Sequence, residues 1–282
     1  WGRILFTQAL LRLPFNPRPL FGIPKTVNPK ALGLLLSAAG YLGDRELARG
    51  AFETLRSLEH PFGYPFPWQS RAFFLKEGEP NGVVVAFLIH GLLEANALID
   101  PGDFLGRLAQ LALERFWRGG WFHYTSFDNY LIHNVNLLLA SALWRLGYRE
   151  EPIRAAEVSA SRQRPDGSWL YGEREKMFRY VDSFHTGFNL LSLRAFGREF
   201  SGAYERGLEF YVKSFVEESG DVRWALGRRY PLDVHAYSVA VGVLAGHPLQ
   251  EKVWDALRRR FLRERVCFRQ YRFYKIKVEY FR

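Results

Sequence analysis

The stretch DSFHTGFNLLSLRAFG, residues 182–197, is long enough for a helix and carries apolar side chains on nearly every face of one. Such a helix is stable only when other elements surround it, so this stretch predicts a buried helix. Similar apolar segments recur along the chain, and each is followed by a glycine-containing turn and a more polar, amphipathic stretch. The apolar segments are 29–42, 83–98, 131–147, 182–197 and 232–246, and the amphipathic ones are 44–58, 103–117, 150–162, 201–217 and 249–263. The sequence therefore predicts a series of helical hairpins, each with a buried inner helix and a half-exposed outer helix.

The hairpins repeat at intervals of about fifty residues. His133 and His185 are 52 residues apart, and His185 and His235 are 50 residues apart. The segments between hairpins also repeat, because GYPFPWQS, GGWFHYTS, DGSWLYGE and DVRWALGR each follow an amphipathic segment and each contain a tryptophan. A period of this length is typical of stacked helical hairpins.

We expect one all-α domain over residues 1–282, built as an α/α toroid from about five to six helical hairpins. No linker rich in Pro, Gly or Ser separates the periodic segments, which argues against two domains. An open solenoid would leave one layer of helices facing water, whereas a closed ring can bury both faces of its inner helices. The apolar inner segments therefore favour the toroid. The C-terminal FRQYRFYKIKVEYFR alternates aromatic and basic residues, which predicts a short β-hairpin or an extended tail.

The composition narrows the class of protein. No apolar run reaches the roughly 18 residues of a bilayer-spanning helix. The single cysteine, Cys267, excludes an intrachain disulfide and a cysteine-rich zinc site, and it favours a reducing, cytoplasmic location. The first residue is Trp1 rather than methionine, which leaves room for a trimmed upstream segment. We expect no cofactor and no metal, since the phosphate-loop, dinucleotide, zincin and hydrolase-elbow motifs are absent from the sequence.

The chain is basic, with a net charge of +10, and most of its 39 basic residues are arginines. A guanidinium group pairs with the two oxygens of a carboxylate or phosphate, which favours a glycan or sugar-phosphate substrate, acidic ones included. Because the basic residues are scattered, a solvated basic face is the alternative, and we expect no nucleic acid partner. The sequence does not set the oligomeric state.

Polar residues gather at the starts of the predicted inner helices. In a ring of hairpins the inner helices all run in the same direction, so their N-termini and the tryptophan-bearing loops meet at one mouth. Helix N-termini favour anions, and flat aromatic faces suit sugar rings. The candidate catalytic residues are His185, Asp182, Glu173, His133 and His235, and the candidate substrate-binding residues are Trp68, Gln69, Asn81, Trp121, Tyr124, Asn134, Trp169, Tyr171, Trp224 and Arg229.

Several of these candidates also have a structural explanation. Asp182 and Asp233 are of a residue type that caps helices, which contributes about 1 kcal/mol. The stretch RPDGSW, residues 164–169, favours a tight turn, and Trp169 within it would fill the gap between neighbouring hairpins. His90 lies deep in an apolar segment and fits a core histidine, whereas three histidines in repeat register favour a site.

Two resemblances accompany these patterns. RQRPDGSW, residues 162–169, resembles the glutamine-tryptophan loop motif of the prenyltransferase and terpene-cyclase toroids, although the acidic signatures of the cyclases do not occur here. Over most of its length the chain resembles bacterial proteins of that toroid superfamily associated with surface-polysaccharide biosynthesis. The stretches that carry this resemblance are PFPWQSR, EPNGVVVAFLIHGLLEA, IHNVNLLLASAL, QRPDGSWLYGE, VDSFHTGFNLLSL and PLDVHAYSVA. The resemblance implies an α/α toroid and a glycan context, without an established reaction.

These observations favour a carbohydrate-active enzyme in surface-polysaccharide biosynthesis that works by acid–base cleavage, elimination or epimerisation. His185, oriented by Asp182, is the expected base, and Glu173 or His133 is the expected acid. Trp169, Trp121 and Trp68 are the expected sugar platforms, and Arg229 is expected to meet negative charge. Two alternatives stay open: a noncatalytic glycan-binding or assembly protein, and an isoprenoid- or lipid-linked-sugar-handling protein similar to the terpene cyclases.

Overall fold

The computed structural model describes residues 2–10, 13, 17–70, 72–173, 175–262 and 267–276, which are almost all in helices, short strands and the turns between them. The chain divides into two compact units. The N-terminal unit comprises residues 26–162 and 172–174, and the C-terminal unit comprises residues 1–25, 163–171 and 175–282. A single domain over the whole chain stays a prediction.

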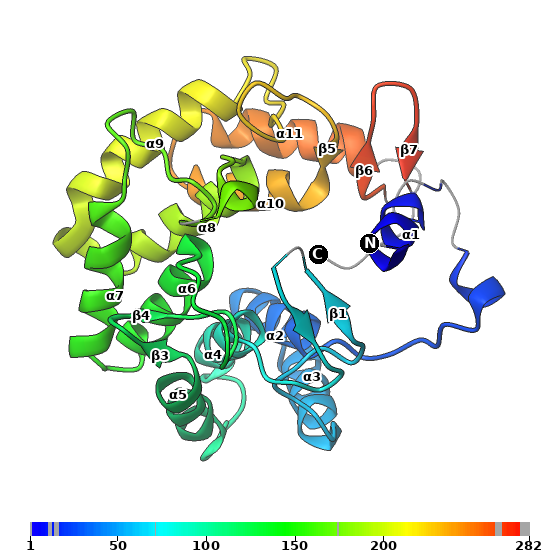
Figure 1. The fold of residues 1–282 in the computed structure, drawn as a ribbon, viewed down its shortest axis with the longest axis vertical. Helices are drawn as coiled ribbons and strands as arrows, with labels where there is room; N and C mark the ends of the chain where they lie inside the picture. Colours follow the sequence, from blue (N-terminus) through cyan, green and yellow to red (C-terminus); the bar gives the residue numbers. More distant parts are fainter. Residues whose placement is uncertain are drawn as a thin grey trace. The chain divides into compact units, whose positions relative to one another are not determined.

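Three helical hairpins form the N-terminal unit (Figure 1). They are α2 (Pro29–Leu42) with α3 (Arg45–Ser57), α4 (Gly82–Ala95) with α5 (Phe104–Arg115), and α6 (His133–Arg145) with α7 (Glu150–Ser161). Helix α4 packs against both α2 and α6, so these three helices form the inner layer that the sequence predicts. The buried side chains of α4 run from Gly82 to Ile89 without interruption, as an apolar helix surrounded by others requires.

Side-chain caps fix where several of these helices begin. Asn28, Asp44 and Asn81 stand immediately before α2, α3 and α4, and each side chain accepts a hydrogen bond from a backbone N–H of the first turn. These bonds satisfy donors that the helix itself cannot pair.

Glycines let α2 approach α4 closely. A Cβ atom at Gly33 would lie 2.6 Å from the carbonyl oxygen of Phe87, and one at Gly91 would lie 2.9 Å from the carbonyl carbon of Gly33. The backbones of α2 and α4 are therefore in direct contact, and a larger residue at Gly33 or Gly91 would force them apart.

Short strand pairs lie in the loops of the N-terminal unit. The pair β1 (Trp68–Gln69) and β2 (Phe74–Leu75) precedes α4, and the pair β3 (Trp117–Arg118) and β4 (Trp121–Phe122) precedes α6. Both pairs are antiparallel.

The C-terminal unit contains two further hairpins. They are α8 (Ser183–Arg194) with α9 (Ser201–Phe215), and α10 (Val234–Val243) with α11 (Gln250–Phe261), and α8 packs against α10. The unit also holds α1 (Gly2–Leu10) and the short 3-10 helices η1 (Arg18–Phe21), η2 (Lys176–Phe178) and η3 (Gly197–Phe200). The expected all-α class and the expected hairpins are thus confirmed.

A small antiparallel sheet closes the described chain. Its order is β5 (Leu232–Asp233), β6 (Arg269–Gln270) and β7 (Lys275–Ile276). The predicted C-terminal β-hairpin is therefore confirmed, and through β5 it is joined to the start of α10. Within the described residues, no helix is long and apolar enough to cross a membrane.

Candidate functional site

The first turn of α8 holds a histidine against a carboxylate. Asp182 precedes the helix, and its Oδ1 accepts a hydrogen bond from the backbone N–H of His185 at 2.7 Å. Its Oδ2 lies 2.7 Å from Nδ1 of the same histidine. The side chain of Asp182 is 7% exposed and that of His185 is 24% exposed. Asp182 thus caps the helix and orients the imidazole at once, so the two explanations drawn from the sequence are both met.

The start of α10 repeats this arrangement. Asp233 Oδ1 accepts a hydrogen bond from the backbone N–H of His235 at 3.0 Å and lies 2.9 Å from the Nδ1 of that ring. The second oxygen of Asp233 accepts a hydrogen bond from Nε of Arg269 on β6, at 2.7 Å. The carboxylate is fully buried, whereas the His235 side chain is 33% exposed. The C-terminal hairpin therefore supplies a cation to the second histidine–aspartate pair.

Aromatic rings connect the two pairs. The Phe184 ring centroid lies 5.2 Å from that of His185 and 6.3 Å from that of His235, so both imidazoles flank one phenylalanine. Tyr171 lies 4.5 Å from His185 and is stacked with Tyr180 at 5.0 Å. The sequence singled out Tyr171 but not Tyr180 or Phe184, although all three stand close to His185 in the sequence. Together they give the C-terminal unit a partly exposed aromatic surface beside two oriented imidazoles.

Loops reach the starts of inner helices in both units. In the N-terminal unit the carbonyl oxygen of Tyr124 accepts a hydrogen bond from Gly82 N–H at 2.9 Å. In the C-terminal unit the carbonyl oxygen of Trp224 accepts one from Ser183 N–H at 3.1 Å. Within each unit, then, the tryptophan-bearing loops contact inner-helix N-termini. The convergence of every inner helix on one mouth stays a prediction.

A second polar cluster lies at the start of α6 in the N-terminal unit. His133 is fully buried, with Nδ1 3.0 Å from Ser159 Oγ and Nε2 3.2 Å from Glu173 Oε1. Asn136 donates to the same serine oxygen at 2.8 Å. The side chain of Glu173 is 27% exposed, so this carboxylate is the solvent-facing member of the cluster. His133 can hold Glu173 in place but is not itself placed to meet a substrate.

Trp169 has the gap-filling role that the sequence offered as its structural explanation, whereas the partners of Arg229 were not predicted. Trp169 is 1% exposed, and its ring packs where a Cβ at Gly207 would stand, so it fills a gap between helices rather than offering a face to a sugar. Arg229 pairs with Asp221 at 2.8 Å and with Glu217 at 3.1 Å, so its charge is already met within the protein.

The other candidate binding residues vary in exposure. Asn81, Asn134 and Tyr124 are buried, Trp68, Trp121 and Trp224 are half-buried, and Gln69 is exposed. Asn81 caps α4, and the Tyr124 hydroxyl lies 3.0 Å from that of Tyr64. No group of three or more His, Cys, Asp or Glu side chains within the described ranges is arranged to hold a metal ion.

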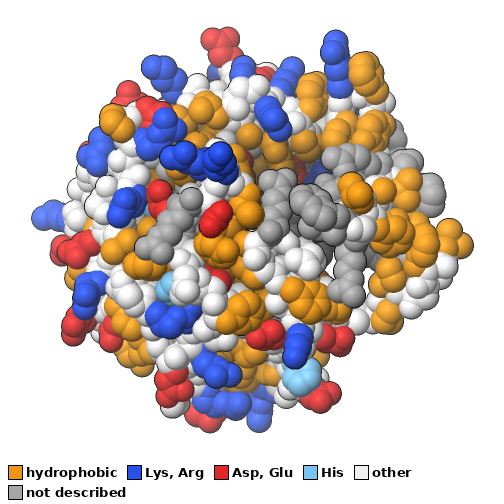
Figure 2. All heavy atoms as spheres, viewed as in Figure 1, with side chains coloured by type: hydrophobic (Ala, Val, Ile, Leu, Met, Phe, Trp, Pro, Cys, Tyr) orange, Lys and Arg blue, Asp and Glu red, His pale blue; other side chains and the backbone are white. Residues whose placement is uncertain are grey.

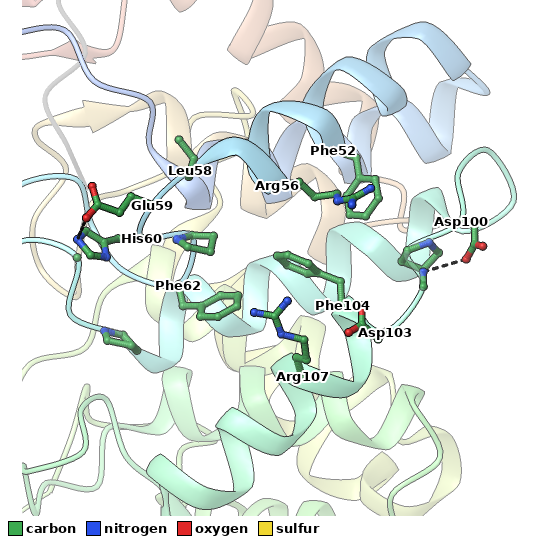
Figure 3. Close-up of a pocket in the computed structure, with 15 residues that line it drawn as sticks. Phe52, Arg56, Leu58, Glu59, His60, Phe62, Asp100, Asp103, Phe104 and Arg107 are labelled. Carbon is green, nitrogen blue, oxygen red and sulfur yellow. Dashed lines mark hydrogen bonds and ion pairs between the residues drawn. The ribbon is translucent and has the colours of Figure 1, made fainter.

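A separate cavity of about 710 Å³ lies in the N-terminal unit between α3 and α5 (Figure 3). Its walls come from the outer helices and from the loops before α4 and α5. None of the residues singled out from the sequence lines it.

No protein-family model matches the chain, and no curated protein matches it. Solved structures do resemble it. A cellobiose 2-epimerase from Bacillus thermoamylovorans is 12% identical with a TM-score of 0.64, over 88% of this chain and 81% of that one. A D-mannose isomerase is 13% identical with a TM-score of 0.58, over 83% and 75% of the two chains. A type II terpene cyclase from Scytonema is 11% identical with a TM-score of 0.56, over 81% and 65%. The likeness shows the fold, which is that of the α/α toroids, as the sequence predicts.

Proposed function

We propose that the protein is a carbohydrate-active enzyme that moves protons on a sugar, with His185 and His235 as its acid–base pair. The observation that carries the proposal is the repeated arrangement at the starts of α8 and α10, where an aspartate holds Nδ1 of a partly exposed imidazole beside Phe184. A carboxylate on Nδ1 fixes the orientation of the ring, so Nε2 is the atom that would exchange a proton with a ligand. The likeness to a sugar epimerase and a sugar isomerase supports the same class of chemistry.

Epimerisation or elimination fits these groups better than glycoside cleavage. Most glycosidases use two carboxyl groups, one on each side of the scissile bond. In the C-terminal unit, Asp182 and Asp233 are instead engaged in orienting imidazoles. Glu173, held by the buried His133 in the N-terminal unit, stays a separate candidate acid.

The proposed epimerisation balances without a cofactor. One neutral imidazole takes a proton from the carbon beside the carbonyl of the open-chain sugar, giving an enediolate. The other imidazole, which is protonated, donates its proton to the opposite face of the same carbon as the carbonyl re-forms, so the configuration changes and no atom is gained or lost. Because the reaction is reversible, each imidazole serves as the base in one direction.

The biological setting is proposed on the sequence resemblance, which points to surface-polysaccharide biosynthesis and, with a single cysteine, to the cytoplasm. An acidic or phosphorylated sugar fits the net charge of +10. Figure 2 shows basic and acidic side chains interspersed over the face drawn, so the excess of positive charge does not gather into one patch there.

Deuterium exchange tests the proposal. The protein is incubated in D₂O with cellobiose, mannose or glucuronate, and NMR follows deuterium uptake at carbon 2 while mass spectrometry follows cleavage or elimination products. We expect turnover by the native chain and a loss of at least about 100-fold in His185→Gln and in His235→Gln. His247→Gln, which removes a histidine outside the proposed site, serves as the matched control. Full turnover by folded His185→Gln protein would refute the assignment, and sugar binding without any product would favour the noncatalytic alternative.

A further inference from the structure

The cavity between α3 and α5 has an aromatic lining. Its volume of about 710 Å³ is in the range of small-molecule sites. Phe104 on α5 lies with its ring centroid 5.9 Å from that of Phe52 on α3 and 5.6 Å from that of Phe62 in the loop after α3. Three phenylalanine rings from three segments therefore line one side of this hollow (Figure 3).

The loops beside these rings are held in place by backbone contacts. The carbonyl oxygen of Phe62 accepts a hydrogen bond from Asn81 N–H at 3.2 Å, and Gly63 pairs with Pro80. Gly78 has a φ of 73° and packs against the His60 ring, where an added Cβ would lie 2.5 Å from Cδ2. This wall of the cavity is therefore formed before any ligand arrives.

Two arginines face the cavity from opposite helices. The Arg56 guanidinium lies 5.8 Å from the centroid of Phe52, and that of Arg107 lies 5.7 Å from Phe104 and 6.0 Å from Phe62. Within the described part of the chain, neither guanidinium takes part in a hydrogen bond or an ion pair. A guanidinium near an aromatic ring keeps its fork of N–H donors available for a carboxylate.

The lining also contains acceptors. Glu59 lies 3.6 Å from the His60 ring, and Asp100 accepts a hydrogen bond from Gly102 N–H at 2.9 Å. Asp103 stands before α5 without a side-chain capping bond. These carboxylates can accept hydrogen bonds from hydroxyl groups, so a ligand that offers hydroxyl groups as well as an anion fits the lining better than phosphate, which offers the anion alone.

We infer that this cavity is an accessory binding site for a sugar acid, a pyranose ring that carries a carboxylate. Arg56 and Arg107 bind the carboxylate, the ring lies against Phe62, and Asp103 accepts from the hydroxyl groups. The inference rests on the proposed function only in taking sugars as the ligand class, because none of the residues assigned to proton transfer lines the cavity.

Binding titrations with three probes test the inference. Glucuronate, glucose and inorganic phosphate are titrated into the native chain and into Arg56→Gln and Arg107→Gln, with NMR or calorimetry as the readout. Arg49→Gln removes the same charge from an exposed position of α3 outside the cavity and is the matched control. We expect glucuronate to bind most tightly, each cavity variant to weaken it by about tenfold or more, and Arg49→Gln to leave it unchanged.

Three results would overturn the inference: no glucuronate binding by the native chain, equal binding of glucose or phosphate, or unchanged glucuronate binding in folded Arg107→Gln. The same titration with His185→Gln separates the two proposals. Glucuronate binding that survives in His185→Gln supports the accessory site, whether or not turnover is lost. Binding that disappears with His185 would place the ligand elsewhere and refute the site while leaving the proton-transfer proposal intact.

Discussion

The contact between α2 and α4 makes an unusual prediction about glycine. Alanine is normally more stable than glycine inside a helix by about 1 kcal/mol. At Gly33, however, an added Cβ would lie 2.6 Å from the carbonyl oxygen of Phe87 and 2.8 Å from its carbonyl carbon, where ordinary contact begins at 3.4 Å. The two backbones would have to separate by about 0.8 Å, and overpacking of this kind costs about 1–3 kcal/mol or more.

We therefore expect Gly33→Ala to lower the free energy of unfolding by about 2 kcal/mol, after the gain in helix propensity is subtracted from the upper end of that range. The matched controls are Gly50→Ala on α3 and Gly106→Ala on α5. No atom lies within 4 Å of a Cβ added at either position. Both controls should raise the free energy of unfolding by about 0.5–1 kcal/mol, because only the propensity term remains.

Urea denaturation followed by far-UV circular dichroism measures both effects on the full chain. The midpoint of Gly33→Ala should fall below that of the native protein, while the midpoints of both controls rise above it. A Gly33→Ala midpoint at or above the native one would refute the close approach of the two helices. A lower midpoint in all three variants would instead mean that alanine destabilises these helices wherever it replaces glycine.

Three further predictions concern charged groups. Burial and a neighbouring arginine lower the pKa of His90 from 6.5 to about 4, so stability present above pH 6.5 should be lost as the pH falls toward 4, by at most about 3 kcal/mol. In His90→Gln the denaturation midpoint should depend less on pH across this window. An unchanged pH dependence would contradict the lowered pKa of His90. Asp221→Asn removes the buried carboxylate that Arg229 and Arg260 share, although Arg229 keeps Glu217, and should reduce stability by about 2–3 kcal/mol in thermal unfolding; a neutral result would mean that the pairs contribute little. Arg269→Met removes the hydrogen bond that joins β6 to the buried carboxylate of Asp233 and should reduce stability by about 1–3 kcal/mol in thermal unfolding, and an unchanged unfolding temperature would refute the role of the arginine.

The helices could be predicted from the sequence because apolar periodicity is a local property. The predicted segment 182–197 becomes a helix over Ser183–Arg194, and the aspartate expected to cap it does so. The pairing of Asp182 with His185 was also accessible, since residues three apart on a helix turn face each other. Contacts between residues within one helical turn could therefore be predicted from the sequence.

Contacts between segments far apart in the sequence could not be predicted in the same way. The sequence predicted that Trp169 fills a gap between hairpins but not that Gly207 leaves the room for its ring, and it did not predict that Asp221 pairs with Arg229. The cavity was missed for a related reason. Phe52 and Phe104 lie on amphipathic helices, where apolar residues indicate packing, and nothing in the sequence distinguishes a ring that packs from a ring that also lines a hollow.

The capping of α8 provides a way to follow the motion of His185 by hydrogen exchange. The carboxylate that holds the His185 ring also accepts the backbone N–H of the same residue. Movement of the Asp182 side chain breaks both bonds, so loss of this helix cap also releases the ring. Hydrogen exchange at this single amide should report how often the imidazole loses its partner, in the absence of any ligand or spectroscopic label.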